Sequence, residues 1–221
     1  MQDHQLMPMF HKKINKKYNI EDCDSMNMAL EKKTLRQFVL QKRRKLSQTI
    51  VHRQSDIVFE QLIGLSVYKK ARCIMFYAAM PDEVQTDKMM RYALQDGKQI
   101  CIPYIHDKNG LMDAVFVFDV NQLSKGDFDI LTINSHDMEF ANPEDIDLMI
   151  IPGVAFDTAG YRLGMGAAFY DRFIMRANQA FCLGIALDCQ IVNKVPIEEH
   201  DCSMDAILTA SGLINSKEGK M

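Results

Sequence analysis

The stretch that decides the fold reads IIPGVAFD over residues 150–157 and GYRLGMGAAFYDR over residues 160–172. It begins with apolar β-formers, continues through a loop punctuated by glycines, and ends in a helical pattern. Backbone N–H groups in such a loop and at a helix start have no intrahelical partners, and the helix dipole adds positive potential. The pattern predicts an anion site and favours a phosphate-bearing ligand, in particular a nucleotide.

Outward from this loop, short apolar runs alternate with helical patterns. Strands are expected over residues 73–78, 99–102, 114–118, 148–151, 182–186 and 206–209. Helices are expected over residues 86–95 and 166–178, after an N-terminal helical pair over residues 30–46 and 47–64. This order predicts an α/β single domain whose mostly parallel central sheet is flanked by helices on both faces. Ligands of such sheets collect beyond the carboxyl ends of the strands, where the glycine-rich loop lies.

The first helix of the N-terminal pair is strongly basic. Its apolar residues approximate one face, which we expect to turn toward the core: Leu30, Leu35, Phe38, Val39 and Leu46. Ser47 is expected to cap the second helix, which would close near Gly64.

Length, charge and cysteine usage bound the class of protein. The 221 residues suffice for one substantial core, and we expect a flexible extension over residues 1–28, the α/β domain over residues 29–212 and a tail over residues 213–221. A net charge of −3 argues against nucleic-acid binding by bulk electrostatics. Apolar runs fall short of the ~20 residues that span a membrane, and the dispersed cysteines favour a reduced, cytoplasmic protein. We therefore expect neither nucleic acid nor membrane as a partner.

Charged side chains around the loop suit a phosphate, although glycines in such a turn often serve backbone geometry alone. Arg162 and Arg172 flank the loop, and Arg172 could equally be a surface residue of its helix. Asp171 could hold a divalent metal beside phosphates. It could equally be a first-turn acid that stabilises the helix dipole.

Several motifs taken together resemble a known family. They read KKTLR at 32–36, MPDEVQT at 80–86, PGVAFD at 152–157, GYRLGMG at 160–166, YDR at 170–172, GIA at 184–186 and HD at 200–201. In this order they resemble the 5-formyltetrahydrofolate cyclo-ligases, also called methenyltetrahydrofolate synthetases, over about residues 32–209.

The resemblance implies an ATP- and Mg²⁺-dependent cyclisation of 5-formyltetrahydrofolate to 5,10-methenyltetrahydrofolate, with release of ADP and phosphate. The partner is then a reduced folate, and the protein is expected to be a monomer or a weak homodimer. Catalytic roles fall on Lys32, Arg162 and Asp171, with Asp171 near the metal. The implied nucleotide-binding residues are Lys32, Arg36, Arg162, Gly164, Met165, Gly166, Ala167, Ala168, Phe169, Tyr170 and Asp171. The implied folate-binding residues are Met80, Glu83, Tyr104, Met112, Phe169 and Tyr170.

The folate-pocket residues also have ordinary structural interpretations. Glu83 can accept hydrogen bonds from the N–H donors of a pterin. It could instead be an acid at the start of the helix that follows Thr86. A methionine is more often a filler of the core than a ligand contact.

Two departures from the family pattern support an alternative function. The family loop reads Gly-x-Gly-(Gly or Lys)-Gly-Tyr-Tyr-Asp, whereas Ala167, Ala168 and Phe169 stand at its fourth to sixth places here. An alanine that replaces a glycine of positive φ costs ~1 kcal/mol or more. In addition, Thr132 stands where the family carries an acid. The alternatives are a non-catalytic folate- or nucleotide-binding relative and an ATP-dependent ligase with another substrate.

Overall fold

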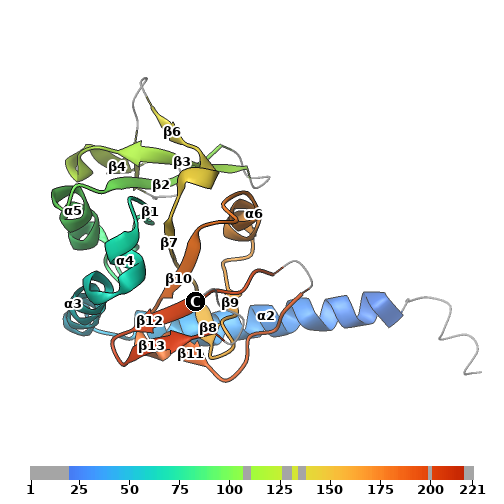
Figure 1. Cartoon of the computed structure of the whole chain (residues 1–221). Coiled ribbons are helices and arrows are strands. Elements are labelled where there is room, and N and C mark those ends of the chain that lie inside the picture. Colours follow the sequence, from blue (N-terminus) through green and yellow to red (C-terminus); the bar gives the residue numbers. More distant parts are fainter. Residues whose placement is uncertain (1–19, 107–110, 126–130, 134–137, 199–200, 217–221) are drawn as a thin grey trace, which may run out of the picture.

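The fold is organised around one eight-stranded sheet with the strand order β13-β12-β10-β7-β1-β2-β3-β6. The structure, a computed structural model, describes residues 20–106, 111–125, 131–133, 138–198 and 201–216 (Figure 1). Five central strands run parallel: β12 (Ala206–Thr209), β10 (Phe181–Ile185), β7 (Leu148–Ile151), β1 (Cys73–Met75) and β2 (Gln99–Ile105). Antiparallel strands close the edges: β13 (Gly212–Asn215), β3 (Met112–Val117) and β6 (Phe140–Ala141). The predicted α/β class with a mostly parallel sheet is confirmed.

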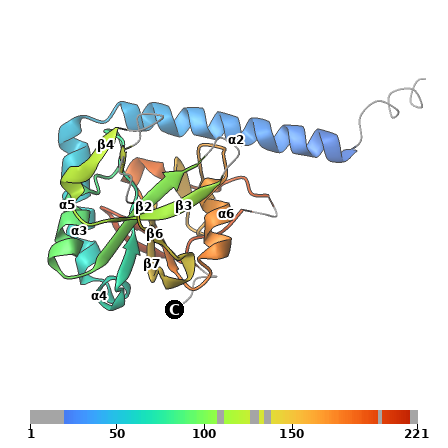
Figure 2. The ribbon, with the colours of Figure 1, turned by 90° about the horizontal axis from the view of Figure 1, so that it is seen from above.

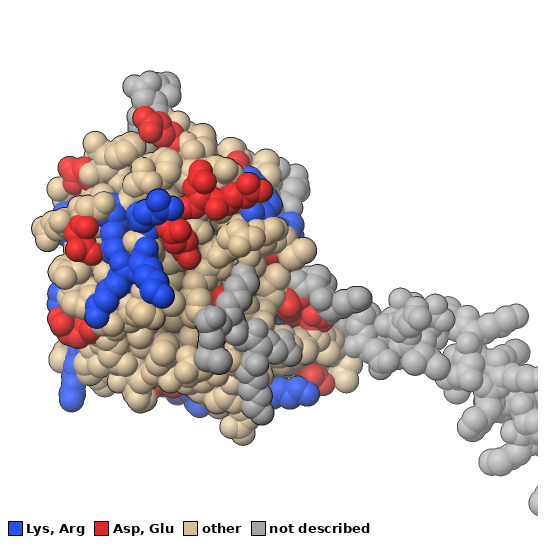
Figure 3. Space-filling view, viewed as in Figure 1, with Lys and Arg blue, Asp and Glu red and all other residues tan. Residues whose placement is uncertain are grey.

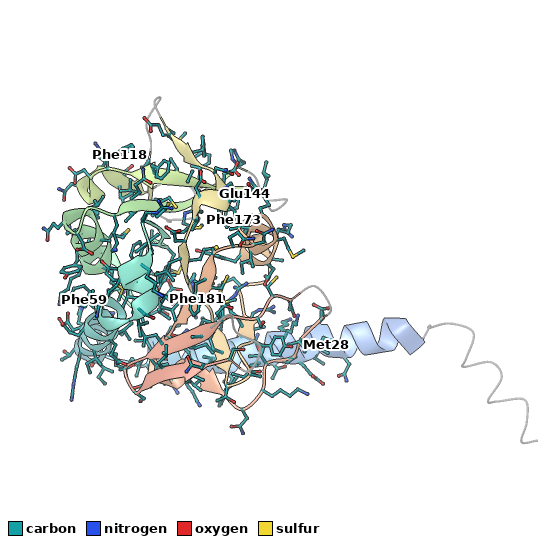
Figure 4. All side chains as sticks on the ribbon, viewed as in Figure 1. Met28, Phe59, Phe118, Glu144, Phe173 and Phe181 are labelled. Atoms are coloured by element: carbon teal, nitrogen blue, oxygen red, sulfur yellow. The ribbon has the colours of Figure 1, made fainter. Side chains whose placement is uncertain are left out.

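Helices cover both faces of the sheet, as predicted. One face carries α3 (Gln48–Gly64), α4 (Ser66–Lys70) and α5 (Asp87–Gln95), and the other carries α6 (Phe169–Arg176) (Figure 1). Alternate residues of each strand enter two separate cores, because successive side chains of a strand point to opposite faces. In β7, Ile150 packs in the core that contains Phe59, and Ile151 packs in the core that contains Phe173 (Figure 4).

Helix α2 (Ile20–Arg44) runs along one side of the molecule, and its first turns project past the rest of the fold (Figure 2). The predicted apolar face of this helix is partly wrong, because Leu30 and Phe38 are 61% and 52% exposed. Val39 of the predicted face is buried, and so are Lys32 and Arg43. The physical reason is that Val39 packs in a small apolar cluster with Ala155 and Leu163, whereas Lys32 and Arg43 pair with acids of other segments.

The junction between α2 and α3 follows the prediction. The Ser47 side chain accepts a hydrogen bond from the Ile50 N–H at 3.4 Å, and α3 ends at Gly64. Helix α5 starts one residue after Thr86, whose hydroxyl donates to the carbonyl of Tyr77 at 2.6 Å. That bond fixes the chain between β1 and α5.

Several short elements were not predicted, because strands of two or three residues show no measurable period. The expected loop 152–166 contains β8 (Ala155–Asp157) and β9 (Arg162–Leu163), which form a small sheet with β11 (Ile191–Val192). Strands β4 (Leu123–Lys125) and β5 (Leu131–Ile133) pair beside the main sheet. The 3-10 turns are η1 (Val120–Gln122), η3 (Pro143–Asp145) and η4 (Asp188–Gln190). The predicted C-terminal tail, from residue 213, begins inside β13.

The surface and the thiols agree with an ordinary globular protein. In the part of the chain that is described, no helix is both long and apolar enough to cross a bilayer. Acidic side chains lie beside the basic ones on the face shown in Figure 3. Cys73, Cys101 and Cys182 are buried free thiols. Because such thiols pack as small hydrophobes, they belong to the core and not to a redox site.

Candidate active site

The candidate site lies beyond the carboxyl ends of the parallel strands, as the α/β pattern predicts. The glycine-rich loop follows β7 through the β8-β9 hairpin, and the turn of residues 80–86 follows β1. Helix α2 contributes the inner-face residues Lys32, Arg36 and Arg43, which contact these two segments or the chain near Asp201. The site is therefore built from segments that lie far apart in the sequence.

The glycines of the loop make room for two arginines. A Cβ at Gly164 would lie 2.9 Å from Nη1 of Arg162, a distance that real side chains do not tolerate. Gly166 has a φ of 111°, which only glycine adopts readily. Arg36 lies over this segment, and its Nε donates to the carbonyl of Gly164 at 2.7 Å. Arg36 and the loop therefore meet as the resemblance implies.

Ala168 holds the left-handed conformation that the family's glycine suggested, with φ 50° and ψ 28°. Among the described residues, no other non-glycine residue has a positive φ. It stands at the N-cap of α6 without a side-chain cap hydrogen bond. The alanine side chain therefore strains the loop at this position.

Among the cations of the loop, Arg162 has the surroundings that best suit an anionic ligand. Its side chain is buried, Nη2 donates to Oδ1 of Asp171 at 2.9 Å, and the guanidinium lies 5.6 Å from the centroid of the Tyr170 ring. Its Nε has no hydrogen-bond partner among the described residues. A buried donor without an acceptor costs about 1–3 kcal/mol, which an anionic oxygen at this place would relieve. The arrangement suits a phosphate.

Asp171 has the first-turn position that one of its two sequence interpretations predicts, and its role as a metal ligand stays a prediction. It lies in the first turn of α6 and pairs with Arg162, and the backbone N–H of Cys202 approaches its Oδ1 at 3.5 Å. No cluster of three or more His, Cys, Asp or Glu side chains that could hold a metal occurs in the described ranges. A single carboxylate still suits Mg²⁺, which usually takes one or two carboxylates together with phosphate oxygens and waters.

Lys32 is held by two acids that sequence reasoning did not assign. Its Nζ lies 2.7 Å from Oε2 of Glu198 and 2.6 Å from Oδ2 of Asp201. Burial lowers the pKa of Lys32, but hydrogen bonds to Asp201 and Glu198 outweigh this effect and raise it. Lys32 is therefore a charged ammonium. Asp201 belongs to the HD motif, the one sequence signal that could have led to it.

Glu83 lies on the turn after β1 and faces Arg43 of α2. Oε1 of Glu83 accepts from Nη1 of Arg43 at 3.2 Å, and its Oε2 accepts from the Met80 N–H at 3.0 Å. Burial raises the pKa of Glu83, while Arg43 acts in the opposite direction. The interpretation of Glu83 as a helix-start acid is wrong, because Asp87 occupies the first turn of α5. Arg43 is a further site residue that the helical pattern did not reveal.

Tyr170 lies in α6, directly after the loop, and interacts electrostatically with both Arg162 and Glu83. Burial raises its pKa, the charge of Arg162 lowers it, and the charge of Glu83 raises it again. The phenol thus lies within electrostatic reach of the loop arginine and of the proposed folate glutamate. The loop and the 80–86 turn therefore both act on the charge of this phenol.

The remaining predicted residues differ in their exposure and in their contacts. Met80 is on the same turn as Glu83 and is 40% exposed, and Met165 is exposed on the loop. Phe169 lies under the guanidinium of Arg172, which donates to the carbonyl of Ala167.

Two predicted folate residues are not brought together. Tyr104 packs against the ring of Phe140 at 5.6 Å on one face of the sheet. Met112 is buried in the core on the opposite face, where it fills space as the structural interpretation proposed. The structure therefore corrects the prediction of a shared lining by Tyr104 and Met112. The side chain of Thr132 lies outside the described residues.

Comparisons with known proteins agree with this geometry. A family model described as the 5-formyltetrahydrofolate cyclo-ligase family matches residues 28–210. A probable 5-formyltetrahydrofolate cyclo-ligase of Caenorhabditis elegans is 30% identical, with coverage of 80% of this chain and 91% of the relative. The mouse 5-formyltetrahydrofolate cyclo-ligase is 29% identical over 80% of this chain and 92% of its own.

A solved structure supports the same assignment. The NMR structure of Aquifex aeolicus 5,10-methenyltetrahydrofolate synthetase has a TM-score of 0.75 to this chain at 30% identity, and the match covers 86% of this chain and 95% of that one. The matched region includes the β7 loop, α6 and the inner face of α2. The chain belongs to the 5-formyltetrahydrofolate cyclo-ligase family.

Proposed function

We propose that the protein catalyses the ATP- and Mg²⁺-dependent cyclisation of 5-formyltetrahydrofolate to 5,10-methenyltetrahydrofolate, with release of ADP and phosphate. One observation supports this more than any other. The buried Arg162, whose Nε has no acceptor among the described residues, lies in a glycine-rich loop that Arg36 also contacts, and Tyr170 connects this loop to Glu83. Together these residues support a phosphate site at the loop and a carboxylate for a pterin on the turn of residues 80–86.

In the proposed reaction the formyl oxygen attacks the γ-phosphorus of ATP. N10 of the folate then adds to the activated carbon, and phosphate leaves. Such chemistry needs aligned substrates and positive charge near the phosphates more than it needs covalent work by the protein. Lys32, Arg36 and Arg162 would supply the charge, and the loop backbone from Gly164 to Ala168 would supply N–H donors.

Asp171 would hold Mg²⁺ once Arg162 turns part of its hydrogen bonding toward phosphate. Bound Mg²⁺ neutralises charge on the transferring phosphoryl group. Lys32 would similarly exchange its two carboxylate partners, Glu198 and Asp201, for phosphate oxygens. Tyr170 and Phe169 would lie at the junction of nucleotide and folate.

On the folate side, Glu83 would accept hydrogen bonds from N–H groups of the pterin. An ionised carboxylate has about four acceptor positions, of which Arg43 and the Met80 N–H each use one. Two positions therefore stay open. Exposed Met80 on the same turn would contribute apolar contact.

Turnover of the purified protein tests the proposal. With 5-formyltetrahydrofolate, ATP and Mg²⁺ we expect the near-ultraviolet absorbance of the methenyl product together with ADP in equal amount. Absence of both products over a range of conditions would contradict an enzymatic function.

The strained Ala168 favours one alternative, a non-catalytic relative that binds folate or nucleotide. Calorimetric titration distinguishes it: tight folate binding without any turnover would support this alternative. Binding of ATP without binding of any folate derivative would instead indicate a ligase with another substrate.

A further inference from the structure

Arg43 is buried at the far end of the α2 inner face, behind the turn that carries Glu83. Its side chain is 3% exposed. Nε and Nη2 donate to the two carboxylate oxygens of Asp82 at 2.9 and 3.3 Å, and Nη1 donates to Oε1 of Glu83 at 3.2 Å. A guanidinium held by such a fork has little freedom to move.

The turn itself is fixed independently of Arg43. The amide of Gln85 donates to the carbonyls of Met80 and Glu83 at 2.9 and 2.7 Å, and its backbone N–H donates to the hydroxyl of Ser55 at 2.9 Å. These bonds hold the backbone of the turn. They leave the Glu83 side chain to be placed by Arg43 and the Met80 N–H.

We propose that Arg43 is a positioning residue for folate: it fixes Oε1 of Glu83, so that the remaining acceptor positions of this carboxylate stay available to the N–H donors of the substrate. The inference rests on the proposed folate role of Glu83. Asp82 anchors Arg43 in turn, and Arg43 itself is too deeply buried to be a surface contact for the substrate.

The electrostatic surroundings of Glu83 give the proposal an opposing pair of variants. The groups that face Glu83 are Arg43 of α2, Asp82 of its own turn, Tyr77 after β1 and Tyr170 of α6, and the Cys189 thiol of η4 faces Arg43. Burial raises the pKa of Glu83, Arg43 lowers it and Asp82 raises it. Loss of Arg43 should therefore raise this pKa further, whereas loss of the Asp82 charge should lower it.

The experiment measures KM for 5-formyltetrahydrofolate and for ATP as a function of pH. We expect Arg43→Gln to raise the folate KM roughly tenfold at neutral pH, as loss of a buried charged hydrogen bond does. The ATP KM should change less than twofold. The acid-side rise of the folate KM should move to higher pH in Arg43→Gln and to lower pH in Asp82→Asn. The matched control is Arg44→Gln, the exposed neighbour on the same helix, which should behave as the unsubstituted protein.

A merely structural role predicts a different result. It would weaken both variants without moving their acid limbs in opposite directions, and that outcome would overturn the proposal. An unchanged folate KM in Arg43→Gln would also overturn it. If Arg43→Gln does not fold, Arg43→Lys, which keeps the charge but not the fork, decides: a raised folate KM with an unaffected ATP KM supports the proposal, and an unchanged folate KM overturns it.

Glu83→Gln separates this inference from the proposed function. A folate KM that is unchanged in Glu83→Gln contradicts the folate role of Glu83. A raised folate KM in Glu83→Gln together with an unaffected Arg43→Gln contradicts the role of Arg43 alone.

Discussion

The two ends of the α2 inner face both carry cationic side chains, but these side chains have different partners. At one end, Lys32 pairs with Glu198 and Asp201, and Arg36 lies over the glycine loop. At the other end, the buried Arg43 forms ion pairs with both Asp82 and Glu83. At the first end, Glu198 and Asp201 hold Lys32 where we propose that a phosphate binds, whereas at the second end the acids belong to the 80–86 turn.

This difference would let one helix serve both substrates of the proposed reaction. An ammonium with a single-atom head exchanges partners easily, while a guanidinium in a bidentate fork keeps its geometry. The Lys32 end is therefore suited to bind a ligand and release it. The Arg43 end is suited to hold a neighbouring protein group ready for a ligand.

The largest effect is expected from the loop cation that faces the Lys32 end. Arg162→Gln removes the buried charge beside Tyr170 and Asp171, so kcat/KM should fall on the order of 10²–10³-fold. Steady-state kinetics measure this, and thermal unfolding shows whether the variant is folded. Arg53→Gln on the exposed side of α3 is the control. Activity close to that of the unsubstituted protein would exclude Arg162 from the phosphate site.

Lys32→Ala should separate the two substrates. Because the proposed contact of Lys32 is phosphate, the KM for ATP should rise roughly tenfold while the KM for folate changes little. The adjacent exposed Lys33→Ala keeps the same net charge change and is the matched control. Equal effects on both substrates would show that Lys32 does not distinguish the nucleotide half from the folate half.

The Arg43 end predicts a pH-dependent stability. Because the pKa of Glu83 is raised in the folded protein, the native state binds more protons than the unfolded state at pH values between the ordinary pKa of a glutamate and the raised one. Ionisation of Glu83 therefore reduces the free energy of unfolding as the pH rises through this window. Glu83→Gln removes that dependence.

Chemical unfolding of Glu83→Gln and of the unsubstituted protein at about pH 4 and about pH 8 measures the effect. The pH dependence of the free energy of unfolding reports the ionisation of Glu83. The difference in free energy of unfolding should shift in favour of the variant as the pH rises. A shift in the other direction would mean that Arg43 overcompensates for the burial of the carboxyl. Glu60→Gln, an exposed acid on α3, controls for general charge effects.

The fold could be read from the sequence wherever the hydrophobic pattern was long enough. Strands β7 and β12 occupy the predicted residues, and α3 begins and ends where Ser47 and Gly64 indicated. The pattern failed on α2, where Leu30 and Phe38 are exposed. Periodicity assumes that the inward face is apolar, and the inward face of α2 is mixed, with Val39 in an apolar cluster and Lys32 and Arg43 paired with acids.

The site could be predicted in part, and mainly through its motifs. Side-chain hydrogen bonds join the segments that carry the motif residues Lys32, Arg36, Glu83, Arg162 and Asp171 to other parts of the chain. Their partners could not be read from the sequence, because Lys32 and Glu198 are 166 positions apart. Local patterns contain no information about pairs that only the sheet topology brings together.

The smallest effect is expected at Ala168, the departure from the family pattern that takes a left-handed conformation. Ala168→Gly relieves left-handed strain of ~1 kcal/mol but gives the unfolded chain more freedom, so the free energy of unfolding should stay within about 1 kcal/mol. Nucleotide affinity measured by calorimetry should be preserved or improved. Ala167→Gly, without a positive φ to relieve, is the control. A clear loss of nucleotide affinity in Ala168→Gly would indicate a remodelled loop.

A crystal structure with a non-hydrolysable ATP analogue, Mg²⁺ and 5-formyltetrahydrofolate tests the central claim most directly. We expect a phosphate oxygen within hydrogen-bond distance of the Arg162 Nε, Lys32 turned from Glu198 and Asp201 toward the phosphates, and Arg43 still paired with Glu83. A nucleotide bound elsewhere, or a loop closed against phosphate by the methyl groups of Ala167 and Ala168, would contradict the account.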